Sequence, residues 1–380
     1  MNILLLTDGI TPYVTGGMQK HSYVMAKLLA KNNCTVTLVH CGITYQHSFN
    51  QHYSDIFTEK EREYITPIFV PFIKMGRLPG HYIKESKWYS KRIGETYNLN
   101  QELPKFDLIY AQGFTGWHFL ENKHHIPVIV NLHGYEMFQK APNLKVKLEH
   151  FLLRPFVKQT LKKADYVLSF GGEIDRIISS LNVPNSKLIQ QSNGIETNWI
   201  TTNQPKTLSV KTFTFIGRYE RRKGIEELTI ALKQLIKDEK NFIFNFIGPI
   251  AKEHQINHSQ INYLGEIKNA NKIKSILDDS DFLISPSYSE GMPTVILESM
   301  ARGNAIIATN VGANSRMINQ NGILIDSTPI SIENGIKKAL QLNDSELLKM
   351  KQKSIKLVKN QFTWESVIQQ QLVEFRKVIQ

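Results

Sequence analysis

The sequence predicts an α/β protein that contains two doubly wound parallel sheets in tandem. Short apolar runs that stop at glycine or polar residues recur along the chain, and segments of helix length separate them. A polar, threonine-rich stretch with one proline, residues 196–211, divides these runs into two series. With 380 residues, the chain is long enough for two domains of common size. We therefore expect two domains that face each other across a cleft.

The first series begins with the apolar run "NILLLT" (2–7), which is typical of a buried first strand in a parallel sheet. The segment "GGMQKHSYVMAKLLAKN" has apolar residues at helical spacing, and "CTVTLVHCG" follows as a second strand. Three later runs, "PKFDLIYAQG", "IPVIVNLHG" and "ADYVLSFGG", repeat the strand pattern. Residues 1–195 are thus predicted to form the first domain.

The second series has six runs of the same kind: "TFTFIGR", "FIFNFIG", "INYLGE", "DFLISPS", "NAIIATN" and "GILID". They predict a second sheet within residues 196–361. The tail "FTWESVIQQQLVEFRKVIQ" (362–380) has apolar residues near helical spacing and predicts an amphipathic helix that caps the structure.

Composition describes a globular protein and excludes several classes. Hydrophobic residues make up 41% of the chain and charged residues 21%. The net charge of +12 is spread over both halves, and no zinc-finger, RRM or helix-turn-helix signature accompanies it, so no nucleic-acid partner is expected. A diffuse positive charge equally suits phosphate-bearing small substrates or an acidic membrane surface. The two cysteines form no zinc motif or disulfide framework, and no apolar run is long enough to span a membrane; a cytoplasmic protein is expected.

Two motifs end strands in the first domain. In "DGITPYVTGGMQKH", Gly16 and Gly17 open the first helix and can bring backbone amides to an anionic group, although an ordinary tight turn has the same pattern. In "NLHG", His133 is placed at the same edge of the sheet, where a packed or solvated histidine is the alternative.

A stronger motif, "FIGRYERRKGIEEL", ends the first strand of the second domain. Arg218, Arg221, Arg222 and Lys223 lie between Gly217 and the next helix. Several cations at a strand end beside a helix N-terminus suit a diphosphate, whereas a solvated basic turn is the simpler reading.

Two carboxylates flank a loop in "YSEGMPTVILE". Pro293 favours the first turn of a helix, which leaves Glu290 before the helix and Glu298 inside it. Carboxylates accept hydrogen bonds from two hydroxyls at once and therefore suit sugar and ribose hydroxyls. Otherwise Glu298 is a solvated helix residue and Glu290 an acid near a favourable helix end.

Two further segments give weaker signals. Asp279 and Asp281 form a D-x-D motif, but they precede a strand and so lie at the wrong end of the sheet for a metal site. The basic amphipathic stretch "NLKVKLEHFLLRPFVKQTLKKAD" suits an anionic lipid surface. Pro155 is expected to interrupt it, and its apolar face is expected to pack on the first sheet.

Together these motifs resemble those of the family 4 retaining glycosyltransferases, which have the GT-B fold of two Rossmann-like domains. The resemblance covers nearly the full chain: "TGGMQKHSYVMAKLLA", "NLHG", "QSNGIE", "GRYERRKGIEEL", "PSYSEGMPTVILESMARG", "TNVGA" and "FTWES" follow in the family's order. It implies that the C-terminal helix returns to the N-terminal domain. One departure is Arg316, which stands in "NVGANSRMI" where family members often carry a glutamate.

The resemblance implies roles for individual residues. Arg218 and Lys223 match the pair that binds the donor diphosphate and stabilises the leaving phosphate; Glu290 matches the glutamate that faces the donor sugar, and His133 the histidine beside it. Glu298 matches the glutamate that holds the ribose. The implied donor site also includes Gly16, Gly17, Gly217, Gly291, Met292, Pro293 and Thr294. The segment 80–90 falls in the acceptor region, which gives His81, Tyr82 and Lys84 as acceptor-side candidates.

The function implied is transfer of a sugar, with retention, from a nucleotide-diphosphate sugar to a glycan or lipid-linked acceptor. UDP-sugars are the first expectation for the donor and GDP-sugars the second; no metal or other cofactor is expected. Surface polysaccharide or glycolipid biosynthesis is the expected process, with peripheral contact to the cytoplasmic membrane face. A nucleotide-sugar epimerase and an inactive, transferase-like binding partner remain the alternatives.

Overall fold

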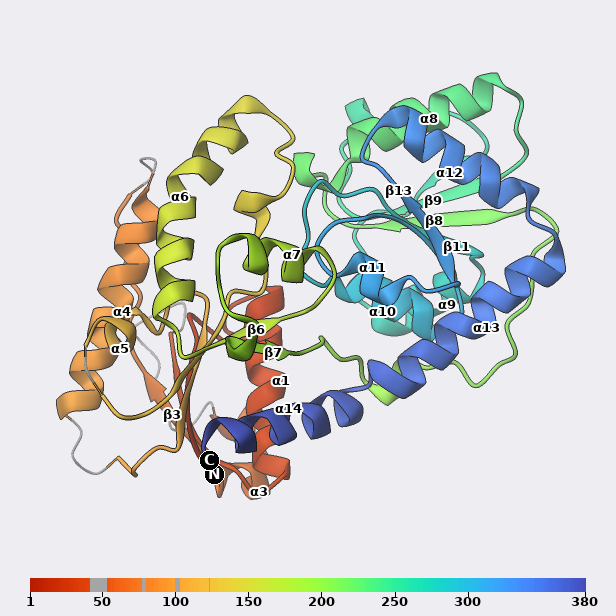
Figure 1. Ribbon diagram of the computed structural model, residues 1–380. Helices are drawn as coiled ribbons and strands as arrows, with labels where there is room; N and C mark the ends of the chain where they lie inside the picture. Colours follow the sequence, from red (N-terminus) through yellow and green to blue (C-terminus); the bar gives the residue numbers. More distant parts are fainter. Residues whose placement is uncertain (42–52, 77–79, 100–102, 123) are drawn as a thin grey trace.

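The computed structural model describes residues 1–41, 53–76, 80–99, 103–122 and 124–380. Each half of the chain builds one parallel sheet, and helices cover the faces of both sheets (Figure 1).

The sheet of the N-terminal half has seven parallel strands among the described residues, in the order β3-β2-β1-β4-β5-β6-β7. The strands are β1 (Asn2–Leu6), β2 (Thr35–His40), β3 (Ile65–Phe69), β4 (Leu108–Gln112), β5 (Val128–Asn131), β6 (Tyr166–Ser169) and β7 (Leu188–Gln190). The helices that surround them are α1 (Gly17–Lys31), α3 (Glu59–Arg62), α4 (His81–Leu99), α5 (Trp117–Glu121), α6 (Leu144–Lys163) and α7 (Glu173–Ser180). The order of strands reverses between β1 and β4, and ligands of such sheets bind at this point.

The second sheet has six parallel strands in the order β10-β9-β8-β11-β12-β13. They are β8 (Thr212–Ile216), β9 (Ile243–Ile247), β10 (Ile261–Tyr263), β11 (Phe282–Ser285), β12 (Ala305–Thr309) and β13 (Gly322–Ile325). The helices of this half are α8 (Ile225–Lys237), α9 (Ala270–Asp278), α10 (Thr294–Ala301), α11 (Asn314–Met317), α12 (Pro329–Gln341) and α13 (Asp344–Gln361). Its order reverses between β8 and β11, so the basic turn and the carboxylate loop both follow strands at this reversal.

Short 3-10 turns join several of these elements: η1 (Tyr53–Asp55), η2 (Glu136–Phe138), η3 (Asn185–Lys187), η4 (Thr197–Trp199), η5 (Arg221–Lys223) and η6 (Lys252–His254). Two of them bear on function. η5 carries the predicted basic turn, and η2 lies in the loop that leads from β5 to α6.

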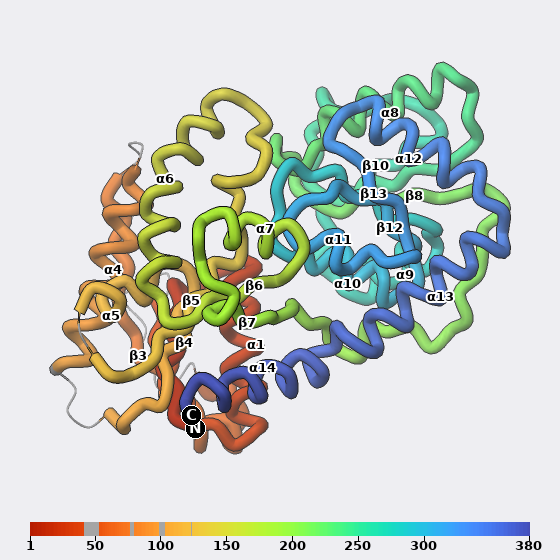
Figure 2. Tube along the Cα trace, viewed as in Figure 1, coloured from red at the N-terminus to blue at the C-terminus, as the bar shows by residue number. Residues whose placement is uncertain are grey.

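The last helix, α14 (Trp364–Val378), returns to the N-terminal half, as the family resemblance implies (Figure 2). Trp364, Val367, Ile368, Leu372 and Phe375 are buried in one apolar cluster with residues of α1 and β2. Backbone hydrogen bonds between Ile195 and the segment 362–364 fix the point where the chain crosses back. The apolar spacing of the tail thus predicts the buried face of α14 correctly.

Of two sequence expectations about α6, the break at Pro155 is wrong, and the packing of its apolar face on the first sheet holds for one face of the helix. The helix runs without a break from Leu144 to Lys163 and passes through Pro155. Pro155 is exposed, and water can satisfy the carbonyl that a proline leaves without an amide partner. Val157 and Leu161 lie in one buried cluster with Val128 and Val167 of the first sheet. On the opposite side of the first half of the helix, apolar side chains stay exposed; Leu144 is 82% exposed and Phe151 65% exposed.

Candidate active site

A cavity of about 280 Å³ lies between the two halves of the chain. Its wall combines the start of α1, the ends of β5 and β6, the start of α14 and the loop between β11 and α10. The lining residues are Gly17, Met18, Lys20, His21, His133, Phe170, Asn193, Gly194, Ile195, Glu196, Trp199, Lys223, Glu290, Gly291, Met292, Pro293, Thr294, Val295, Glu298 and Trp364. The structure thus brings most of the predicted donor-site residues into one cavity; Gly16, Gly217 and Arg218 do not line it.

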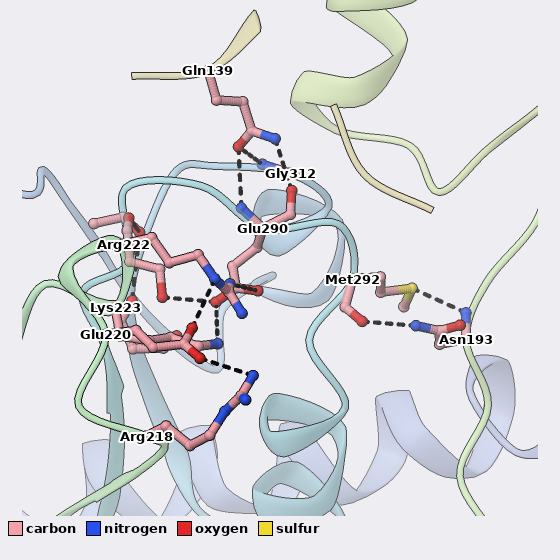
Figure 3. Close-up of polar contacts among 12 residues, drawn as sticks. Gln139, Asn193, Arg218, Glu220, Arg222, Lys223, Glu290, Met292 and Gly312 are labelled. Carbon is pink, nitrogen blue, oxygen red and sulfur yellow. Dashed lines mark hydrogen bonds and ion pairs between the residues drawn. The ribbon is translucent and has the colours of Figure 1, made fainter. Parts of the chain in front are cut away.

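Glu290 is the most highly connected carboxylate of this cavity, and only 6% of it is exposed. Its Oε1 accepts hydrogen bonds from Nζ of Lys223 at 2.6 Å and from Oγ of Ser287 at 2.8 Å (Figure 3). Nη1 of Arg222 lies 3.6 Å from the second oxygen, Oε2. Two cations, Lys223 and Arg222, therefore hold Glu290 in the wall of the cavity.

Arg218 is oriented differently from Lys223. Its side chain is 73% exposed, and Nη2 pairs with Oε1 of Glu220 at 2.8 Å. The other oxygen of Glu220 pairs with Nε of Arg222 at 3.0 Å, so one carboxylate bridges two arginines beside the cavity (Figure 3). Gly217 precedes Arg218 at the end of β8, where its carbonyl lies against Gly248 so closely that a side chain at Gly248 would collide with it.

The loop that carries Glu290 is tied to the N-terminal half through its backbone. Oε1 of Gln139 accepts hydrogen bonds from the amides of Glu290 (3.2 Å) and Gly312 (3.1 Å), while Nε2 of Gln139 donates to the Glu290 carbonyl (2.8 Å) (Figure 3). Gly291 packs directly against the carbonyl of His133, and a Cβ there would overlap it. The glycine of "SEG" is thus required by close contact between the two halves.

His133 is held in a strained backbone conformation at the end of β5, with a φ of 61°. Its amide donates to Oδ1 of Asn131 at 2.9 Å, and its Nε2 lies 2.5 Å from Oε1 of Gln112. An amide oxygen only accepts, so Nε2 carries a proton and Nδ1 is left as the acceptor. Burial, together with the neighbouring ring of His21, lowers the pKa of His133 well below its usual value, and the imidazole is neutral.

Glu298 lies in the second turn of α10 and faces the start of α1. Burial raises the pKa of its carboxyl above the ordinary value, and the ammonium of Lys20 acts in the opposite direction. Gly16 is the N-cap of α1 and Gly17 its first residue, and no side chain in the described part of the chain caps the helix. The unpaired first-turn amides and Lys20 make this end of the cavity positive, which suits an anionic ligand.

One connection across the cavity was not predicted from the sequence. Nδ1 of His21 lies 3.1 Å from Oδ1 of Asn193. Nδ2 of Asn193 in turn donates to the Met292 carbonyl at 2.7 Å (Figure 3). Burial lowers the pKa of His21 to about 4, so this ring is neutral as well. The signals were present in "GGMQKH" and "QSNGIE", but neither spacing indicates that the two motifs meet.

Arg316, the departure from the family pattern, also joins the two halves. Its Nη1 donates to the carbonyls of Phe170 (2.9 Å) and Gln191 (2.6 Å), at the ends of β6 and β7. The aliphatic part of its side chain packs on Gly171, where a Cβ would come within 2.9 Å of Cδ. Arginine at this position therefore has a structural role in the contact between the halves.

The acceptor-side candidates lie on the first turn of α4, outside the main cavity. His81 pairs through Nδ1 with Oε1 of Glu85 at 3.1 Å, and Lys84 is exposed. Tyr82 lines a smaller cavity at the ends of β1 and β4, together with Asp8. Met18 lines both cavities, so the smaller one adjoins the main one.

Asp8, in the smaller cavity, is a functional candidate that sequence reasoning passed over. It follows β1 at the reversal of strand order, and its Oδ1 accepts a hydrogen bond from Nε2 of Gln19 at 2.7 Å. Burial raises the pKa of its carboxyl. Gln112 lines the same cavity, and its Nε2 has no hydrogen-bond partner among the described residues although Gln112 is fully buried.

The second aspartate of the D-x-D motif, Asp281, has a structural role, whereas Asp279 is exposed. Asp281 is fully buried at the start of β11, where Oδ1 accepts from Nζ of Lys351 at 2.9 Å and Oδ2 from the amide of Thr212 at 3.1 Å. Within the described residues, no group of three or more His, Cys, Asp or Glu side chains is arranged to hold a metal ion. No helix of the described chain is both long and apolar enough to cross a membrane.

Comparison with known proteins decides the family. The model of "Glycosyltransferase Family 4" matches residues 15–199, and that of "Glycosyl transferases group 1" matches residues 210–342. The chain belongs to the family 4 glycosyltransferases. These two matches include every strand of both sheets except β1, and the resemblance read from the motifs is confirmed.

Relatives and solved structures agree with this assignment. An uncharacterized glycosyltransferase of Methanocaldococcus jannaschii is 26% identical over 325 residues, which are 83% of this chain and 85% of the relative. An Escherichia coli protein named UDP-Gal:alpha-D-GlcNAc-diphosphoundecaprenol alpha-1,3-galactosyltransferase is 25% identical over 252 residues, which are 60% of this chain and 63% of the relative.

Among solved structures, sucrose-phosphate synthase from Thermosynechococcus elongatus aligns with a TM-score of 0.76 at 16% identity, over 99% of this chain and 98% of that one. HepE of Anabaena, solved in complex with UDP and glucose, aligns with a TM-score of 0.64 at 16% identity, over 99% of this chain and all of that one. The glycosyltransferase therefore has the GT-B fold predicted from its sequence.

Proposed function

We propose that this glycosyltransferase moves a sugar, with retention of configuration, from a nucleotide-diphosphate sugar to a glycan or lipid-linked acceptor. Residues 196–361 bind the nucleotide sugar in this proposal, and residues 1–195 with 362–380 bind the acceptor. The observation that carries it is the cavity in which Lys223 and Glu290 face the uncapped start of α1.

The positive groups of the cavity supply the electrostatic part of catalysis. Departure of the nucleoside diphosphate builds negative charge on its β-phosphate, and fixed cations and amide dipoles stabilise that charge. Lys223 and the first turn of α1 are the groups proposed for this role. Arg218 joins them when it turns from Glu220 to the diphosphate, and its high exposure supports such a movement.

The sugar is proposed to lie beside Glu290 and His133, which both line the cavity. Glu290 accepts hydrogen bonds from sugar hydroxyls once Lys223 turns to the phosphate, and Nδ1 of the neutral His133 accepts another. The bond from the anomeric carbon to the phosphate oxygen breaks, the bond to the acceptor oxygen forms on the same face, and the acceptor's hydroxyl proton passes to the leaving phosphate. No metal takes part in this proposal.

The nucleotide is proposed to lie along the start of α10. The amides of Gly291, Met292 and Thr294 lie at the N-terminus of this eight-residue helix, and Glu298 accepts from the ribose hydroxyls. UDP is the first choice of nucleotide and GDP the second. HepE of Anabaena binds UDP, and the name of the Escherichia coli relative includes UDP-Gal, which supports this order.

The acceptor is proposed to bind on the N-terminal half beside Tyr82 and Asp8, with His81 and Lys84 close by on the first turn of α4. The diphosphoundecaprenol-linked acceptor in the name of the Escherichia coli relative supports a lipid-linked substrate, as in the synthesis of surface polysaccharides or glycolipids. A location in the cytoplasm, with contact to the membrane face, completes the proposal. Two free, buried cysteines, Cys34 and Cys41, support a reducing compartment.

Nucleotide binding and product analysis test the proposal. A ligand that binds only the folded state raises the melting temperature, so UDP, GDP and ADP, free and as sugar conjugates, are compared by thermal unfolding. The nucleotide that stabilises most is then supplied as its sugar with acceptor mixtures, and NMR of the product gives the anomeric configuration. Release of nucleoside diphosphate without any acceptor requirement would favour the epimerase alternative, and binding without turnover would favour the inactive partner.

A further inference from the structure

The helix α6 presents two opposite faces over its length. Val157, Thr160 and Leu161 are buried, and the residues that share their side of the helix, at positions 146, 150 and 153, are partly buried. This face attaches α6 to the rest of the N-terminal half, with contacts to α5 and η2. None of the described residues covers the opposite side of its first half in this way.

The uncovered side carries four large apolar side chains, which we term the α6 stripe: Leu144 (82% exposed), Leu148 (64%), Phe151 (65%) and Leu152 (42%). Their spacing of four, seven and eight residues places them on one face of the helix. Most other exposed large apolar residues of the described chain occur singly on different elements. A contiguous apolar row of this length marks a contact surface.

Basic residues surround the α6 stripe. Lys145 and Lys147 flank it on either side, and Lys158, Lys162 and Lys163 follow on the same helix; all five are exposed. None of the five forms an ion pair with another described residue, and Glu149 is the one acid within α6. An apolar row with uncompensated lysines at its edges is the pattern of a helix that lies in the interface of an anionic bilayer.

The position of α6 connects this surface with the candidate active site. The helix begins six residues after Phe138, and Gln139 in the intervening loop hydrogen-bonds the backbone of Glu290. The first half of α6 and the start of α4, which carries the acceptor-side residues, lie at the same end of the N-terminal half (Figure 1). A bilayer in contact with this end would hold a lipid-linked acceptor near both the smaller and the main cavity.

We infer that the α6 stripe is a membrane-docking surface, and that its partner is a bilayer of acidic phospholipids. The leucines and Phe151 enter the boundary between headgroups and acyl chains, and the lysines bind the lipid phosphates. The supply of a lipid-linked acceptor to the cavity rests on the proposed function, whereas the membrane contact itself does not.

A second copy of the chain fits this surface less well. Two α6 stripes in contact would bring their flanking lysines together, and like charges at an interface disfavour association. Four side chains on one helix also provide little apolar area compared with the roughly 1,200 Å² that stable interfaces bury. The charge distribution therefore favours an anionic lipid surface.

Vesicle co-sedimentation of the full chain tests the inference. The wild type is expected to bind vesicles of phosphatidylcholine with phosphatidylglycerol and to remain in solution with phosphatidylcholine alone. The double variant Leu148→Ser/Phe151→Ser is expected to partition at least tenfold less strongly, because it removes two apolar anchors. Lys145→Gln/Lys147→Gln is expected to lose roughly fivefold for each lysine at low salt.

Matched controls separate docking from general surface effects. Ile330 is 71% exposed on α12, and Lys349 is exposed on α13, so Ile330→Ser and Lys349→Gln make the same chemical changes far from α6. Both are expected to bind vesicles as the wild type does. Unchanged melting temperatures for all variants would show that the folds are intact, since every substituted side chain is exposed.

Two results would overturn the inference. One is a wild type that stays in solution with the anionic vesicles, or a Leu148→Ser/Phe151→Ser variant that binds them as well as the wild type does. The other is a concentration-dependent dimer, detected by sedimentation velocity, that only the α6 variant fails to form; this would assign the surface to a second copy. Thermal stabilisation by nucleotides is measured on the same variants, and it reports on the proposed function independently of lipid binding.

Discussion

Replacement of Lys223 by alanine gives the sharpest test of the electrostatic mechanism. The Lys223 side chain is 17% exposed, and its ammonium lies 2.6 Å from Oε1 of Glu290. In the proposed reaction the Lys223 ammonium turns from Glu290 to the leaving phosphate. Negative charge develops on this phosphate as the transition state forms. Loss of one such fixed donor costs about 3–4 kcal/mol of barrier height, or roughly a 100- to 1000-fold decrease in kcat.

The same substitution has a smaller effect on folding. Glu290 keeps the hydrogen bond from Ser287 and the nearby guanidinium of Arg222 at 3.6 Å, so its carboxylate is not left unpaired. We expect the free energy of unfolding to fall by about 2 kcal/mol. The expected loss of catalytic activity is therefore larger than the expected loss of folding stability, and the two effects can be distinguished.

The assay measures release of nucleoside diphosphate with saturating donor and acceptor, alongside denaturant unfolding. Lys349→Ala, an exposed lysine on α13, is the control and should change neither quantity. A Lys223→Ala enzyme that turns over at the wild-type rate would refute the role assigned to Lys223. Arg218→Ala tests the second cation in the same way, without the loss of stability, because Arg218 is 73% exposed.

Three further changes test other parts of the structure. Glu298→Gln should weaken binding of the free nucleoside diphosphate about tenfold by calorimetry, since an amide replaces a ribose acceptor; equal affinities would remove that role. Lowering the pH from about 6.5 to about 4 should destabilise the protein. In this range His21 takes up a proton in the unfolded state, whereas in the folded state its pKa is about 4 and it stays largely neutral. The free energy of unfolding should fall by about 3 kcal/mol at the lower pH. A His21→Gln variant should show a shallower pH dependence in denaturant titrations, and superimposable curves would contradict this. Asp281→Asn should lower the free energy of unfolding by about 3–5 kcal/mol, because it leaves Lys351 buried without its counter-charge; an unchanged denaturation midpoint would argue against that pair.

The central strands of both sheets were predictable from the sequence, and two edge strands of the first sheet were not. Buried parallel strands such as β4 and β5 are continuous apolar runs, which the pattern detects. β3 contains Pro67, which is tolerated because the strand lies at an edge, and β7 has three residues of which one is buried. Neither segment has the pattern of a buried strand.

The site was predictable in part for a similar physical reason. Strand ends at the reversals of strand order collect ligand residues, and this principle places His133, Lys223 and Glu290 in one cavity. The orientation of Arg218 depends on its pairing with Glu220, and the link between His21 and Asn193 depends on contacts between residues 172 positions apart. Local sequence patterns carry no information about such contacts.

The return of α14 to the first sheet has a consequence for synthesis on the ribosome. Tyr110 and the inner face of α1 are covered by α14, with the rings of Tyr110 and Phe375 5.3 Å apart. At roughly ten residues per second, α14 emerges about half a minute after α1. Until α14 is synthesised, the apolar surface of α1 and Tyr110 stays uncovered, and a chaperone can bind it. The N-terminal half therefore completes its core only after the last helix has been made.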